Sequence, residues 1–110
     1  MDIVHEKDGD VVIFRLSGRL DSNAAASAEA DLGAAVAGAP SLAIDLSGLD
    51  YISSAGLRVM LVLARKVQQA SGKLALFGLQ PAVRQVFTVS GFDTIISIQP
   101  DAAAALAHVR

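Results

Sequence analysis

The amino-acid sequence predicts an α/β fold: a single domain over residues 1–110 with a mixed, mostly parallel β-sheet, an N-terminal antiparallel hairpin and about four helices. Strand-like apolar runs alternate with helix-like segments, which is typical of crossover units in a parallel sheet. The turn sequence Asp8-Gly9-Asp10 lies between the first two strand-like runs and favours a hairpin. Hydrophobic residues make up 53% of the chain and charged residues 18%, a balance that supports a buried core.

The first half of the chain is expected to hold three strands and one helix. These are strands over 3–6, 11–17 and 42–46 and a helix over 23–37. The stretch Gly18-Arg19-Leu20-Asp21 predicts a break after the second strand, and Asp21, Ser22 and Asn23 are all good helix N-caps. Gly38-Ala39-Pro40 predicts the end of the helix.

The second half continues the alternation. It is expected to hold helices over 54–70, 81–90 and from 101 onward, and strands over 74–78 and 95–98. Pro81 suits the first turn of its helix, and Gly91 predicts the end of that helix. In the helix over 54–70, one apolar stripe is widened by further apolar residues, which favours deep packing over docking on a second face. The stripe is Leu57, Leu61, Ala64 and Val67, and the residues that widen it are Val59, Met60, Val62 and Leu63.

Composition excludes several classes of function. The net charge is −2 and there is no basic run, which argues against nucleic acid or an anionic membrane as the main partner. No cysteine is present, so disulfides, a thiol nucleophile and thiolate metal sites are excluded. The start of the chain does not look like a signal peptide, and the longest apolar run, 59–64, falls far short of the roughly 20 residues of a membrane span. These features fit a protein of the reducing cytoplasm.

Two serines mark the candidate site. The strand over 42–46 is expected to run into a short polar loop that ends on Ser53 and Ser54, where a helix begins. Loops after the carboxyl ends of parallel strands are where α/β sheets present their sites. Ser53 is the better N-cap, which leaves the Ser54 hydroxyl free to face solvent, whereas the simpler interpretation makes Ser54 an ordinary first-turn serine. Gly56 keeps the first turn uncrowded, so that a partner or a kinase cleft can approach.

Asp21 also has two interpretations: it caps the first helix, or its carboxylate pairs with an arginine of a partner. Catalysis finds little support. Ser54 lacks the G-x-S-x-G elbow, and the two histidines, His5 and His108, lie near the ends of the chain. The aspartates do not show a metal-binding spacing, and no cofactor motif occurs. We therefore expect no catalytic residue, no metal and no cofactor.

Four blocks resemble the STAS domain, and in particular the bacterial anti-sigma factor antagonists. They are GRLD at 18–21, IDLSGLDYISSAGL at 44–57, PAVRQVF at 81–87 and SG at 90–91. The resemblance extends over nearly the whole chain. The second block is quite specific, and the third is supporting.

The resemblance implies a protein that is not an enzyme and is a monomer when free. In its unphosphorylated form such a protein binds an anti-sigma factor, itself a serine kinase, and so frees the sigma factor. The kinase phosphorylates a serine at the entrance of the second helix, which ends binding, and a PP2C-type phosphatase resets the cycle. The matching phosphoserine is Ser54 and the matching partner-contacting carboxylate is Asp21. The implied footprint is Asp21, Ser22, Asn23, Ser53, Ser54, Ala55, Gly56, Leu57, Arg58 and Val62.

Two positions depart from the family pattern. The family commonly carries an aspartate before the phosphoserine and a serine after it, where this chain has Ser53 and Ala55. Ser53 is therefore a rival phosphate acceptor. An alternative function also stays open, a STAS-type scaffold or sensor that binds a nucleotide, a lipid or another small ligand without a phosphorylation cycle.

Overall fold

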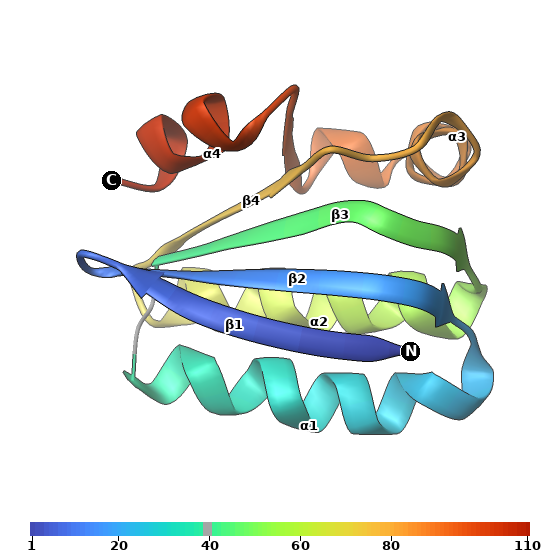
Figure 1. Cartoon of the computed structure of the whole chain (residues 1–110), viewed down its shortest axis with the longest axis horizontal. Helices are drawn as coiled ribbons and strands as arrows, with labels where there is room; N and C mark the ends of the chain where they lie inside the picture. The colour runs from blue at the N-terminus through green and yellow to red at the C-terminus, as the bar shows by residue number, and fades with distance from the viewer. Residues whose placement is uncertain (39–40) are drawn as a thin grey trace.

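The computed structural model describes residues 1–38 and 41–110, which form one five-stranded sheet, four α-helices and a short 3-10 helix, η1. In chain order the elements are β1 (Asp2–Asp8), β2 (Val11–Leu20), α1 (Ser22–Gly38), β3 (Ser41–Ile52), α2 (Ser54–Gln69), β4 (Lys73–Phe77), α3 (Pro81–Ser90), η1 (Phe92–Thr94), β5 (Ser97–Gln99) and α4 (Ala102–Val109). The strand order is β1-β2-β3-β4-β5, with β1 antiparallel to β2 and every later pair parallel. Figure 1 shows β1 to β4 in this order. The predicted fold class is confirmed.

The second strand is longer than predicted. β2 continues through Gly18 and ends at Leu20, so the break expected at 18–21 is wrong. Gly18 adopts a φ of 96°, a conformation that favours glycine, and the pairing register with β3 shifts on both sides of it. Such bulges absorb an extra residue and let the pairing continue. β2 therefore ends directly before Asp21.

The third strand is also longer than predicted, because β3 continues to Ile52. The polar loop expected before Ser53 is wrong. Gly18 pairs with Leu49 and Leu20 pairs with Ile52, so the polar stretch is held in the sheet. The bulged pairing buries only Leu49 and Ile52 within it, and this spacing hides the two-residue alternation by which strands are recognised. Ser53 alone separates the strand from α2.

Helices lie on both sides of the sheet (Figure 1), and an apolar cluster is buried on each face. Helices α1 and α2 bury the larger apolar cluster, to which α1 contributes Ala28 and Leu32 and α3 contributes Phe87. On the opposite face, Ala105 and Val109 of α4 pack with residues of β2, β3 and β4. None of the helices in the described part of the chain is long and apolar enough to cross a membrane.

The packing of α2 is deep, as predicted, although its centre differs from the predicted stripe. Leu61 and Ala64 are only half-buried. Of the residues that widen the stripe, Val59, Met60 and Leu63 are buried, whereas Val62 is half-buried. The buried residues of α2 are Gly56, Leu57, Val59, Met60, Leu63 and Val67.

The ends of the later elements follow local signals. Pro81 occupies the first turn of α3, and Gly91 ends that helix with a φ of 79°. The last strand begins at Ser97, two residues later than predicted, because the backbone N–H of Ile95 donates to the carbonyl of Phe92 (3.0 Å) and completes a turn there. α1 ends at Gly38, and the other two residues of its predicted stop signal, 39 and 40, lie outside the described residues.

Candidate functional site: the entrances of α1 and α2

The first turns of α1 and α2 begin at the same end of the sheet. Leu20 and Ile52 are paired across β2 and β3, so Asp21 and Ser53 each follow a paired residue. The backbone N–H of Ser53 also donates to the carbonyl of Leu20 (2.9 Å). The register therefore brings the two helix entrances together at the carboxyl ends of parallel strands, the usual place for a site in such sheets.

Ser53 is the N-cap of α2, as predicted. Its side-chain oxygen accepts a hydrogen bond from the backbone N–H of Gly56 (3.1 Å), and its hydroxyl donates to the carbonyl of Leu20 (3.3 Å). The residue is half-buried and its backbone is extended, which is the usual conformation of a cap. Both the donor and an acceptor position of this hydroxyl are thus in use.

Ser54 is the first residue of α2 and is exposed. Within residues 1–38 and 41–110, its hydroxyl forms no hydrogen bond. It lies at the positive end of the helix dipole, where free backbone N–H groups favour an anion. The two adjacent serines therefore differ: one hydroxyl holds the helix end, and the other faces solvent.

Asp21 caps α1 in the same way. Its Oδ1 accepts a hydrogen bond from the backbone N–H of Ala24 (3.0 Å), and the residue is half-buried. Ser22 and Asn23 follow it and are exposed on the first turn of α1. The capping interpretation of Asp21 is confirmed, and the carboxylate remains partly accessible at the same corner as Ser54.

The predicted role of Gly56 is wrong. Gly56 is buried, and a Cβ there would lie 2.7 Å from the carbonyl oxygen of Leu20 and 2.9 Å from Cγ1 of Ile52. The glycine therefore allows the first turn of α2 to pack closely on the ends of β2 and β3. The missing side chain of Gly56 makes room for contacts inside the molecule and not for a partner.

The remaining predicted residues lie on different sides of α2. Arg58 is exposed and Ala55 is half-buried. Val62 is half-buried in the seam between α1 and α2, against Leu32 and Gly33, and is not on the open side of the helix where we expected it.

Leu57 is buried and lines a hollow of about 380 Å³ that α3 completes. Ala82, Val86 and Val89 line the same hollow, and Val89 is 79% exposed. The footprint predicted from the sequence did not include these α3 residues. Val89 was detectable as an apolar residue on the outer side of an amphipathic helix.

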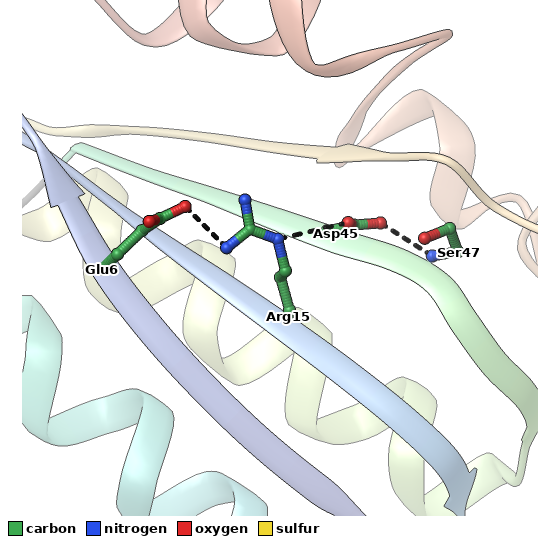
Figure 2. A network of polar contacts seen from close by, with 4 residues as sticks. All are labelled: Glu6, Arg15, Asp45 and Ser47. Atoms are coloured by element: carbon green, nitrogen blue, oxygen red, sulfur yellow. Dashed lines mark hydrogen bonds and ion pairs between the residues drawn. The ribbon is translucent and has the colours of Figure 1, made fainter.

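A second polar network lies on the sheet itself, away from the helix entrances. Arg15 of β2 forms ion pairs with Glu6 of β1 (2.6 Å) and Asp45 of β3 (3.8 Å), and Asp45 accepts from the backbone N–H of Ser47 (2.9 Å) (Figure 2). These contacts connect three strands. The charged groups of this network therefore form ion pairs with one another.

The two histidines lie on other elements than the Ser54 corner. His5 is on β1 against the ring of Phe14, with ring centroids 5.5 Å apart, and His108 is in the last turn of α4. The geometry of the corner suits recognition by another molecule, since it combines exposed hydroxyls, a carboxylate and an adjoining apolar hollow.

Known proteins are similar to this chain in both sequence and fold. A sequence model of the STAS domain matches residues 2–105. The Bordetella bronchiseptica protein BtrV, provisionally named an anti-sigma factor antagonist, is 42% identical over 111 residues, which cover 100% of this chain and 96% of that protein. The anti-sigma-B factor antagonist of Listeria monocytogenes is 29% identical and covers 87% of this chain and 85% of that protein.

Solved structures agree. The crystal structure of an anti-sigma factor antagonist from Mycobacterium paratuberculosis has a TM-score of 0.90 and 29% sequence identity, covering 99% of this chain and 93% of that chain. The sequence match and the shared fold extend over both helix entrances. This chain therefore belongs to the STAS domain family, among the anti-sigma factor antagonists.

Proposed function

We propose that this protein, in its unphosphorylated form, binds an anti-sigma factor that is a serine kinase, and thereby releases a sigma factor in the cytoplasm. Phosphorylation of Ser54 by that kinase ends the binding, and a PP2C-type phosphatase restores it. The observation that carries the proposal is that two adjacent serines differ in hydrogen bonding and in exposure. Ser53 holds the end of α2, while the Ser54 hydroxyl beside it is exposed.

Ser54 is the better phosphate acceptor for a physical reason. A kinase needs access to the hydroxyl and must remove its proton, and the half-buried Ser53 hydroxyl is already bonded to Leu20 and Gly56. A phosphate on Ser53 would break the cap of α2, at a cost of about 0.5–2 kcal/mol. Ser54 loses no bond when it is modified.

A phosphate on Ser54 acts on the partner more than on the fold. The start of α2 tolerates a dianion because of the helix dipole, and Arg58, one turn further on, is at the spacing for an ion pair with it. Buried against a partner, however, the same dianion is desolvated, which weakens the complex. A loss of about 3 kcal/mol, roughly a hundredfold in affinity, is sufficient for a switch.

The proposed footprint surrounds the two helix entrances. It contains the residues of the first turns, and it extends over the hollow between α2 and α3, whose apolar lining suits a side chain of the partner. Its members are Asp21, Ser22, Asn23, Ser53, Ser54, Ala55, Leu57 and Arg58, with Val86 and Val89 added from α3, whereas Val62 is left out because it lies in the seam between α1 and α2. Gly56 contributes only by positioning the turn.

The experiment uses the whole chain with a recombinant serine-kinase anti-sigma factor from the same genome. With ATP, the wild-type chain is expected to gain one phosphate, which peptide mass spectrometry places on Ser54. Ser54→Ala is expected to bind the anti-sigma factor without being phosphorylated, and Ser54→Glu to bind about a hundredfold more weakly. Full phosphorylation of Ser54→Ala, or undiminished binding by Ser54→Glu, would contradict the proposal.

A further inference from the structure

The edge of the sheet at β1 is open, and a groove runs beside it. Among residues 1–38 and 41–110, β1 pairs only with β2 and its other edge has no partner strand, and all of its residues except Ile3 are exposed. Two adjoining hollows of about 780 and 270 Å³ lie between β1 and α1, which run alongside each other in Figure 1. Both hollows are lined by Ile3 and Asp31. They therefore form one groove along the free strand edge.

The floor of the groove is largely apolar, although His5 and Glu6 also line it, and charged residues lie toward its ends. Ile3, Val12 and Phe14 from the sheet and Ala34 and Ala35 from α1 line the larger hollow. Asp2 and Asp31 lie toward its Met1 end, and in the described part of the chain neither of them forms an ion pair. Lys7 lies toward the hairpin turn.

A free strand edge beside a groove of this kind can accept an extended peptide as an additional strand. The edge supplies backbone N–H and C=O groups, and alternate side chains of the peptide enter the groove. Such a strand advances about 3.3 Å per residue, so the seven residues of β1 can accompany a segment of similar length.

The charges of β1 disfavour a second copy of the chain as this strand. In an antiparallel pairing of two β1 strands centred on His5, Asp2 faces Asp8, and in one centred on Glu6 that residue faces itself. Centred on Val4, the pairing sets Asp2 against Glu6. Like charges directly opposite one another destabilise a strand pair.

We propose that the edge of β1 and the groove beside it bind an extended segment of a partner protein by strand addition. The segment carries apolar residues at alternate positions, which enter the groove over Ile3 and Phe14, and a basic residue that faces Asp2 and Asp31. None of the residues that line the two hollows belongs to the footprint proposed around Ser54, so the groove gives the chain a second contact that phosphorylation leaves in place.

The test uses the whole ¹⁵N-labelled chain and two synthetic peptides of about nine residues. Both alternate valine with polar residues, which are lysine and threonine in one peptide and glutamate and threonine in the other. The lysine peptide is expected to shift the amide resonances of β1 and of the α1 segment around Asp31 and to slow hydrogen exchange in β1. The glutamate peptide is expected to bind at least about tenfold more weakly.

Matched variants locate the site. Ala34 is exposed and lines the groove, so Ala34→Phe fills it without entering the core and is expected to weaken the lysine peptide at least about tenfold. Ala30 is exposed on the same helix and lines neither hollow, so Ala30→Phe is expected to leave binding unchanged. Ser54→Glu is also expected to bind the peptide normally, which separates this proposal from the function proposed above.

Three outcomes would overturn the strand-addition proposal. The first is that neither peptide shifts the amide resonances of β1. The second is that both peptides bind with equal affinity. The third is that Ala34→Phe and Ala30→Phe bind the lysine peptide with the same affinity. If the lysine peptide does not bind while the apolar dye anilinonaphthalene sulfonate occupies the groove, the groove is a small-molecule pocket instead.

Discussion

Replacing Gly56 by alanine should destabilise the protein, although alanine is the better helix former. The new Cβ would lie 2.7 Å from the carbonyl oxygen of Leu20, 2.8 Å from Cγ of Leu20 and 2.9 Å from Cγ1 of Ile52. Overpacking of this kind costs about 1–3 kcal/mol. The upper end applies, because one of the three atoms belongs to the backbone of a central strand and cannot move aside.

The gain in helix propensity offsets part of that cost. Alanine in a helix interior is favoured over glycine by about 1 kcal/mol, so the expected net loss is about 2 kcal/mol. For a domain of this size the melting temperature should fall by about 8 °C. Urea unfolding followed by circular dichroism at 222 nm measures the change directly, and the chain has no tryptophan to follow by fluorescence.

Gly33 in α1 provides the matched control. A Cβ at Gly33 would meet only Nζ of Lys66, at 3.3 Å, and a lysine ammonium can move away. Gly33→Ala should therefore stabilise the protein by about 0.5–1 kcal/mol. If Gly56→Ala proved as stable as the wild type, the close packing of α2 on the ends of β2 and β3 would be refuted.

Three further predictions concern the polar groups. Ser53→Ala should lower the free energy of unfolding by about 1 kcal/mol through the lost cap, whereas Ser54→Ala should change it by less than about 0.5 kcal/mol; parallel urea titrations compare them. Asp21→Asn keeps an oxygen for the cap, so it should preserve stability yet weaken binding of the anti-sigma factor, measured by calorimetry, and unchanged binding would exclude a role for the carboxylate. Arg15→Met should cost no more than about 1 kcal/mol in thermal melts, since Arg15 and Glu6 are half exposed and the pair with the less exposed Asp45 is 3.8 Å long, and a larger loss would show that the network on the sheet holds β1 in place.

The order of the elements could be predicted from the sequence because each long segment has one dominant pattern. The hairpin turn at Gly9 and the proline and glycine at the ends of α3 confirm local rules. The ends of β2 and β3 could not be predicted. Both strands continue across bulges, and a bulge removes the two-residue alternation that identifies a strand.

At the candidate site, the local capping geometry could be predicted and the tertiary contacts could not. Local capping rules were enough to separate Ser53 from Ser54. The role of Gly56 depends on Leu20, which is remote in sequence, and only the pairing of β2 with β3 brings the two together. For the same reason the α3 side of the hollow near Leu57 was missed.

The corner around Ser54 is held in place by contacts that do not involve the Ser54 side chain. The carbonyl of Leu20 accepts from both the backbone N–H and the hydroxyl of Ser53, which ties the cap of α2 to the end of β2. Gly56 then allows the first turn to pack against the same strand ends. A phosphate on the exposed Ser54 disturbs neither contact, so its effect falls on whatever is bound there. The switch that we propose therefore acts through charge and desolvation at a preformed surface, without a change of fold.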